Sequence, residues 1–172
     1  ATRERLLDAG DPELAASLSD LATLLWRKGA LPAADSLFCQ ALAIQEGRFG
    51  ERNADVATTL GNLGLLRRDR GSYAAAESLA RRSLELRRSL YAGASLEVAD
   101  GLNILAGILL SRGDAAAAEP FSREALAMRR QLLGSPHPDV AEALNNLATI
   151  LEAGGRYAAA EKILAGCMPA IT

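Results

Sequence analysis

A period of 42 residues runs through this chain of 172 residues. The same signals return in each copy: a leucine, a glycine eight positions later, and then an alanine followed directly by an acidic residue. Four copies in register indicate a repeat array, in which each unit buries its apolar face against its neighbours. The leucines are Leu21, Leu63, Leu105 and Leu147, and the glycines are Gly29, Gly71, Gly113 and Gly155.

The repeats follow one another without insertions. Repeats 1 to 3 occupy residues 11–52, 53–94 and 95–136, and repeat 4, at 137–172, has a shorter second half. Residues 1–10 match the end of a repeat when they are shifted by three periods, which places Leu6 on Leu132. We therefore expect one continuous domain that opens on the tail of a preceding repeat helix. This segment either marks a fragment of a longer protein or is an N-terminal cap of the array, and we favour the fragment.

Each repeat carries two helical patterns. Apolar residues recur at spacings of three and four in the first half of repeat 1, as on one face of a helix. A second apolar pattern follows after a short turn, and the pair recurs in every repeat. The apolar stripe of the first pattern is Leu14, Leu18, Leu21, Ala22 and Leu25.

Glycine and proline mark the helix boundaries. Gly29 should end the first helix and Pro32 should open the second, while Asp11, Asn53 and Ser95 are expected caps. Small residues at 22, 64, 106 and 148 should let the two helices of a repeat approach closely. The expected helices are 12–28, 32–47, 54–70, 73–91, 96–112, 115–133, 138–153 and 157–168.

The composition excludes several classes of partner. A formal net charge of -2 and a pI near 5.5 give no electrostatic basis for binding nucleic acid or an anionic membrane. No apolar run approaches the roughly 18 residues that a membrane-spanning helix needs. Cys39 and Cys167 lie too far apart in sequence to suggest a disulfide or metal framework, and neither has a sequence neighbour that would activate it. We expect a reducing, cytoplasmic location.

Catalytic and cofactor signals are missing from the sequence. The single histidine, His137, lies between two prolines. One histidine in this position gives little support for a histidine-dependent catalytic triad or for a two-histidine zinc motif. Neither of the glycine-rich phosphate-binding motifs occurs. We therefore expect no enzyme activity, no cofactor and no metal.

Three segments of the last repeat carry a family resemblance: HPDVA at 137–141, LNNLA at 144–148 and GRYAAAEK at 155–162. Together with the glycine turn they resemble the tetratricopeptide repeat, and a period longer than the usual of about 34 residues is similar to the kinesin light chain subtype. The resemblance implies an all-α, right-handed superhelical solenoid of antiparallel helix pairs. It also implies a concave groove that receives a peptide or helix from a partner protein. The alanine- and arginine-rich composition favours a bacterial array.

Helical phase places one face of each first helix in that groove, opposite the buried stripe. We single out twelve candidate contact residues there: Trp26, Arg27, Asn62, Leu65, Arg68, Asp100, Asn103, Ile104, Leu110, Glu142, Asn145 and Asn146. The same faces also carry Ala16, Ser19, Asp20, Thr23, Thr58, Gly61, Asp69, Gly107, Ser111, Thr149, Glu152 and Ala153.

Asn62 and Asn146 occupy one helical phase, two periods apart, and are expected to face one shared groove. A carboxamide both donates and accepts, so each could pair with a partner's backbone amide and carbonyl. Simple solvation of an exposed helix face explains them equally well. Trp26 is either a groove anchor or a cover for the edge of the first repeat.

The groove list holds five acids, Asp20, Asp69, Asp100, Glu142 and Glu152, against Arg27 and Arg68, a balance of 2 - 5 = -3. This charge suits a mildly basic peptide, although charged helix faces are more often only solvated.

Arginines also recur along the second helices. They pair by position as Arg81 with Arg123, Arg87 with Arg129 and Arg88 with Arg130. Because no aromatic residues are interleaved for stacking, we interpret this row as a solvated face rather than a nucleic-acid surface. Arg67 stands where other repeats have leucine, which makes repeat 2 less apolar there. Tyr73 and Tyr157, at matching turns, are interpreted as packing residues.

The sequence thus predicts a non-catalytic protein-binding scaffold. Two alternatives stay open. One is self-association, because the short last helix should leave Ile163, Leu164, Cys167 and Met168 without a covering helix, and the array could form a homo-oligomer through this end. The other is a regulatory sensor module of a larger signalling enzyme.

Overall fold

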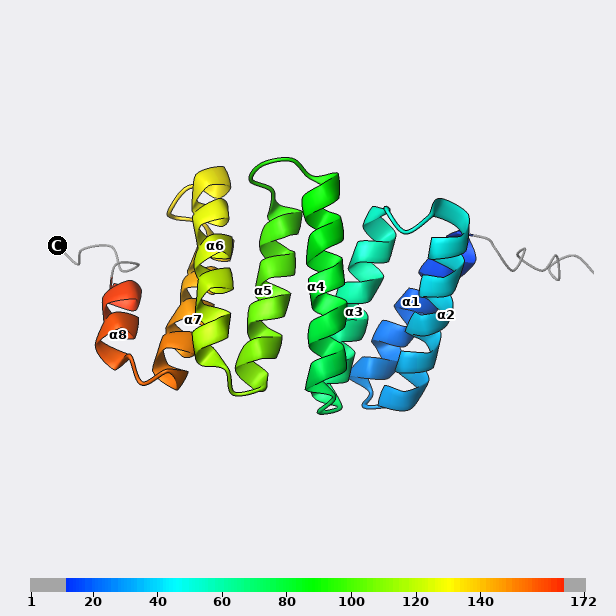
Figure 1. Cartoon of the computed structure of the whole chain (residues 1–172), viewed down its shortest axis with the longest axis horizontal. Helices are drawn as coiled ribbons and strands as arrows, with labels where there is room; N and C mark the ends of the chain where they lie inside the picture. The colour runs from blue at the N-terminus through cyan, green and yellow to red at the C-terminus, as the bar shows by residue number, and fades with distance from the viewer. Residues whose placement is uncertain (1–11, 166–172) are drawn as a thin grey trace, which may run out of the picture. The chain divides into compact units, whose positions relative to one another are not determined.

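The computed structural model describes residues 12–165, and within them the chain forms helices and no strand (Figure 1). The predicted tail at 1–10, the Asp11 cap, Cys167 and Met168 lie outside these residues. The all-α architecture of helix pairs is confirmed. The helices are α1 (Pro12–Arg27), α2 (Leu31–Phe49), α3 (Ala54–Asp69), α4 (Tyr73–Leu90), α5 (Leu96–Ser111), α6 (Ala115–Leu133), α7 (Pro138–Ala153) and α8 (Tyr157–Ala165).

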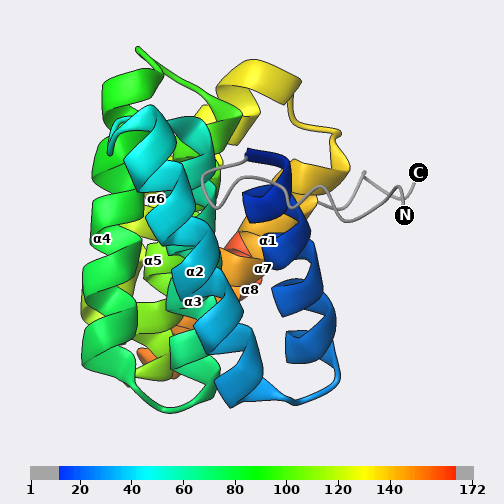
Figure 2. The same ribbon diagram turned by 90° about the vertical axis from the view of Figure 1, so that its right-hand side faces the viewer.

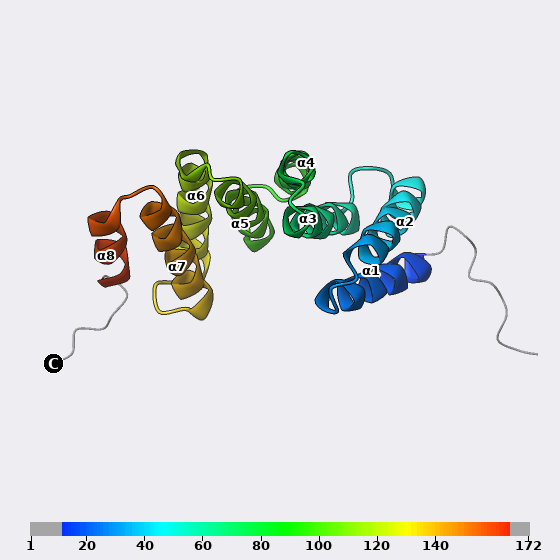
Figure 3. The same ribbon diagram turned by 90° about the horizontal axis from the view of Figure 1, so that it is seen from below.

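The helices gather into two compact units, with α1–α4 in unit 1 (residues 1–90) and α5–α8 in unit 2 (residues 91–172). In unit 1, α2 packs against both α1 and α3, and α4 packs against α3 (Figure 3). In unit 2, α6 packs against both α5 and α7, and α8 packs against α7. In both units, therefore, the second helix of one repeat is covered by the first helix of the next.

The turn inside each pair depends on glycine. Gly29, Gly71, Gly113 and Gly155 all have positive φ, between 74° and 91°, a region that L side chains adopt only with strain. This conformation closes the first helix and reverses the chain, as Figure 2 shows for α1 and α2. The conformational demand explains why glycine recurs with the period.

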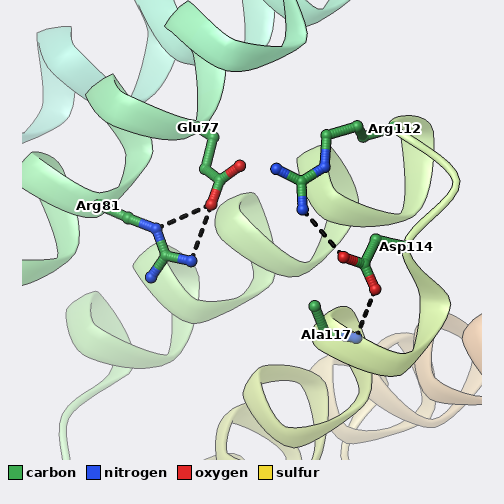
Figure 4. Close-up of polar contacts among 5 residues, drawn as sticks. All are labelled: Glu77, Arg81, Arg112, Asp114 and Ala117. Carbon is green, nitrogen blue, oxygen red and sulfur yellow. Dashed lines mark hydrogen bonds and ion pairs between the residues drawn. The ribbon is translucent and has the colours of Figure 1, made fainter.

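Side-chain caps begin several helices. Asn53 Oδ1 accepts from the Asp55 amide at 2.7 Å and Ser95 Oγ from the Val98 amide at 3.0 Å, so both predicted caps are confirmed. Asp114, which the sequence analysis did not single out, accepts from the Ala117 amide at 3.0 Å and pairs with Arg112 at 2.9 Å (Figure 4). These two hydrogen bonds lower the pKa of the Asp114 carboxyl group.

The leucines that recur with the period are not equally buried. Leu63, Leu105 and Leu147 are buried, with Leu63 only 2% exposed, whereas Leu21 is 47% exposed. Leu63 belongs to a cluster with Ala22 and Phe38, which α1 and α2 supply from the preceding repeat. No preceding helix pair exists for Leu21 among the described residues, so its predicted burial is wrong. The small residues at 22, 64, 106 and 148 are buried, and the close helix approach expected at them stays a prediction.

Arg67 replaces an apolar contact by a polar one. Its Nε donates to Asp35 Oδ1 at 3.1 Å and its Nη2 lies 3.8 Å from Cys39 Sγ, so Cys39 has a cationic neighbour that the sequence did not reveal. The hydrogen bond to Asp35 raises the pKa of Arg67. The expected loss of apolar packing at this position is thus offset by an ion pair between α2 and α3.

The interpretation of Tyr157 as a packing residue is wrong, because its side chain is 69% exposed at the start of α8. Tyr73, at the matching position of α4, is half-buried. The difference shows again that equivalent positions of the repeat have unequal cover.

Candidate peptide-binding surface

A pocket of about 270 Å³ lies in unit 1, where α1, α2 and α3 meet. Asn62 is the singled-out candidate that lines it, and five further residues of the predicted groove faces join it: Ala16, Ser19, Asp20, Thr23 and Thr58. The lining is completed by Gln45, Phe49, Asp55 and Thr59, which the sequence analysis did not name. Within unit 1, the predicted faces of α1 and α3 therefore converge on one concave site.

Trp26 and Arg68 are brought together by an aspartate. Trp26 Nε1 donates to Asp69 Oδ2 at 2.9 Å, and Arg68 donates from Nη2 to Asp69 Oδ1 at 2.8 Å. The indole also meets the Phe38 ring edge to face, with centroids 6.5 Å apart. Trp26 is thus held against the first core cluster, and of its two interpretations the structure favours the cover for the edge of the repeat.

In unit 2, an arginine of α6 lies between α5 and α7. Arg129 is 7% exposed, and its Nη2 donates to Asp100 Oδ1 at 2.7 Å while Nη1 donates to the Asp139 carbonyl at 3.4 Å. The Asn103 amide is oriented with Oδ1 toward this guanidinium, 2.8 Å from Nη1, since only that orientation pairs an acceptor with the donors. Two predicted groove residues, Asp100 and Asn103, are therefore bound by the protein's own arginine.

The interpretation of the arginine row as a solvated face is wrong for two of its members. Arg87 and Arg129 are buried, at 8% and 7% exposure, and Arg87 Nε donates to Ser83 Oγ at 3.4 Å. The remaining arginines of the row are exposed. Two of them pair with a glutamate one turn earlier on the same helix, Arg81 with Glu77 (Figure 4) and Arg123 with Glu119, each at 2.8 Å.

The buried arginine changes the charge of the predicted groove. The Asp100 carboxylate is paired with Arg129, which the sequence-based balance of charges did not include, so that balance overstated the acidity of these faces by one charge. Asp20 and Asp55, both at the unit 1 pocket, have no cationic partner among residues 12–165. These two carboxylates therefore leave unpaired negative charge at the pocket.

The other singled-out residues differ in exposure. Leu65, Ile104 and Leu110 are half-buried. Arg27, Glu142, Asn145 and Asn146 are exposed on their helices, the last three on α7. These exposed side chains are accessible to a partner, and their role as binding residues stays a prediction.

The end of unit 2 is partly covered. Ile163 and Leu164 are partly buried against a core cluster that includes Leu126 and Val140. Because α8 packs on α7 within the described residues, the expectation that these side chains lack a further covering helix stays a prediction.

Two further features concern the described residues as a whole. None of the helices between residues 12 and 165 is both long and apolar enough to cross a membrane. Within residues 12–165, no three side chains of the histidine, cysteine, aspartate and glutamate types gather as they would around a metal ion.

Comparison with known families decides the assignment of the chain. The sequence profile described as Tetratricopeptide repeat matches residues 13–89 and 97–168. The chain belongs to the tetratricopeptide repeat family. A search of curated protein sequences gave no match.

Solved structures of kinesin light chain type repeats share the tetratricopeptide fold of this chain. The crystal structure of BtubC (BKLC) from P. vanneervenii matches with a TM-score of 0.82 and 27% identity, over 91% of this chain and 63% of that one. The chain thus spans less than two thirds of that protein. A kinesin light chain protein of P. anserina with nearly identical TPR-like repeats matches in one variant with a TM-score of 0.83 and 20% identity, over 95% and 77% of the two chains.

The tetratricopeptide register also shows what the sequence reasoning missed. Gln45 occupies the position that Arg87 and Arg129 hold in the next two repeats. The aligned repeats already show a glutamine in place of a recurring arginine. They do not show that this position is buried, because its burial depends on the neighbouring helices.

Proposed function

We propose that this tetratricopeptide-repeat chain is a non-catalytic module that binds a segment of a partner protein on the exposed faces of its first helices. Tetratricopeptide repeats generally mediate protein–protein interaction. Here the proposal goes further and assigns the contact to the faces that carry Asn62 in unit 1 and Asn145 and Asn146 in unit 2.

The observation that carries the proposal is the unit 1 pocket. It is lined by six residues that helical phase had assigned to a binding face, and most of its lining is polar. A pocket that presents hydrogen-bonding side chains beside a half-exposed aromatic ring, Phe49, offers both orientation and apolar contact to a bound segment. Asn62 supplies a carboxamide there, which can hold both a donor and an acceptor of a partner's backbone.

The test compares partner capture by immobilised chains from an extract of the source cells. The variants are Asn62→Ala, Asn146→Ala and the double substitution. Gln131→Ala, which removes an exposed carboxamide from α6, is the matched control. A protein that the wild type and the control retain, and that the double variant loses, supports binding at these faces. Equal retention by all five chains would place the contact elsewhere and overturn the assignment.

Self-association is a second candidate, favoured by the exposed ring of Tyr157 at the start of α8. Light scattering on the purified chain over a range of concentrations tests it. A mass that rises with concentration for the wild type and not for Tyr157→Ser supports a homo-oligomer through this end. A constant monomer mass removes this candidate.

We also propose a cytoplasmic location and an attachment to a larger signalling protein. The sparse cysteines support the cytoplasmic location. Fractionation of source cells with an antibody against this chain gives both the compartment and the size of the parent protein.

A further inference from the structure

The unit 1 pocket contains buried acceptors with no donor. Gln45 is 5% exposed, and its Oε1 has no hydrogen-bond partner among the described residues. Ser19 Oγ, also in the lining, is buried and has none either. Buried polar atoms are normally paired, and leaving one unpaired costs free energy, so a site with two of them is built to receive donors.

Unit 2 shows what fills the equivalent space. Two periods along the chain, Gln45 becomes Arg129, Ser19 becomes Asn103 and Asp55 becomes Asp139. There the Arg129 guanidinium binds the Asn103 amide oxygen and the Asp139 carbonyl. In unit 1 the shorter glutamine lines a pocket at the equivalent position of the repeat.

The charge of the pocket matches the same ligand. The carboxylate that binds Arg129 in unit 2 comes from Asp100, whose equivalent in unit 1 is Ala16. Asp20 supplies a carboxylate one helical turn further along α1, and Asp55 adds another from the start of α3. No arginine, lysine or histidine is among the described lining residues, so a bound cation would have both carboxylates to itself.

Size and shape favour arginine over other cations. At about 270 Å³ the pocket is smaller than the roughly 300–1,000 Å³ of sites for drug-sized ligands, which suits one long side chain. A guanidinium carries five N–H donors in a fixed plane against three rotating donors on lysine, and the acceptors here are several. The Phe49 ring, 43% exposed at the pocket, offers a face on which a guanidinium can stack.

We propose that the pocket between α1, α2 and α3 is a specificity subsite for an arginine side chain of the bound partner segment. The subsite rests on the proposed function, because it assigns one residue type to the segment that the first-helix faces would bind. The partner's arginine would take the place that Arg129 takes in unit 2.

The experiment follows amide and side-chain resonances of the whole chain by NMR while N-acetyl-L-arginine amide is added. We expect saturable shifts at Ser19, Asn62 and the Gln45 side chain, with a dissociation constant on the order of 1 mM for so small a probe. N-acetyl-citrulline amide, which is neutral and of the same shape, should bind about tenfold more weakly or worse. Equal binding of the two amides, or no shift with the arginine amide, would overturn the proposal.

Two variants locate the site. Gln45→Arg should fill the pocket from within, as Arg129 does, and abolish the shifts while the chain stays folded. Asp20→Asn, on an exposed helix face, should weaken arginine-amide binding several-fold and leave the circular dichroism spectrum unchanged. Unaltered binding in both variants would place the amide elsewhere and refute the subsite.

A third arm separates a peptide from a metabolite. Free L-arginine carries an α-ammonium and an α-carboxylate where the blocked amide has neutral ends, and a subsite for a side chain holds neither group, so it should bind no more tightly than the blocked amide. Tighter binding of the free amino acid would assign a small-molecule site and overturn the peptide proposal. If a captured partner is lost by Asn62→Ala but kept by Gln45→Arg, the subsite fails while the proposed function stands.

Discussion

Arg129 and Asp100 are joined by a 2.7 Å hydrogen bond that ties α6 to α5 in unit 2. The two residues differ in exposure: the arginine side chain is 9% exposed and the aspartate 54%. Most of the guanidinium is thus shielded from water, while its partner stays partly solvated. Charge placed inside a repeat array in this way must be satisfied by neighbouring helices.

Substitution of Arg129 should therefore cost more than substitution of an exposed arginine. Arg129→Gln leaves Asp100 and Asn103 without their donor, and we expect the free energy of unfolding to fall by about 1–3 kcal/mol. Arg130→Gln, the exposed neighbour on α6, should change it by less than about 0.5 kcal/mol. Urea unfolding followed by circular dichroism measures both, and an equal loss in the two variants would contradict the structural assignment.

The ion pairs of Glu119 should make the free energy of unfolding depend on pH. Hydrogen bonds from Arg123 and Arg156 lower the pKa of this carboxyl group in the folded chain, with desolvation opposing them. Because the folded pKa lies below the unfolded value of about 4.3, the stabilisation is fully present above that value. It is lost as the pH falls through the lower, folded pKa.

The measurement compares unfolding free energies at pH 7 and pH 3. Arg123→Gln should reduce the part of the acid-induced loss that Glu119 causes, by no more than about 1 kcal/mol because the ion pair is at the surface. Arg130→Gln serves as the control on the same helix, since its side chain is not bonded to Glu119. An identical pH dependence for Arg123→Gln and the wild type would show that the pair does not stabilise the fold.

The cap of α5 gives a local prediction. Ser95→Ala removes the acceptor for the Val98 amide and should lower the free energy of unfolding by about 1 kcal/mol. Ser111→Ala, at the other end of the same helix, removes only a bond back to the Gly107 carbonyl and should have a smaller effect. Thermal denaturation of the two variants in parallel measures both losses of stability. A larger loss for Ser111→Ala than for Ser95→Ala would count against the cap.

Equivalent leucines should respond unequally to truncation. Leu63→Ala creates a cavity in a closed cluster and should cost about 2–5 kcal/mol, whereas Leu21→Ala, at 47% exposure, should cost well under half of that. Chemical denaturation of each variant is the test. Similar losses at the two positions would mean that Leu21 is covered in solution by something outside residues 12–165.

The sequence determined the helices of this protein. The predicted helix ends lie within two residues of the observed ends across α1–α7, because caps such as Asn53 and Ser95 and turns such as that at Gly71 are satisfied by atoms a few positions away. The predicted end of the last helix at 168 lies beyond the described residues. Assignment of one groove to Asn62 and Asn146 stays a prediction.

The tertiary structure decided burial and partners. Arg123 and Arg129 are the same residue type six positions apart on α6, yet only the second is enclosed, because α7 lies over it. Leu21 and Leu63 share a place in the period and differ in the helix that covers them. Likewise, Gln45 became part of a pocket only when α1 and α3 stood on either side of α2. A repeat fixes what each residue offers locally, but desolvation depends on neighbouring helices, and these differ from one copy of the repeat to the next.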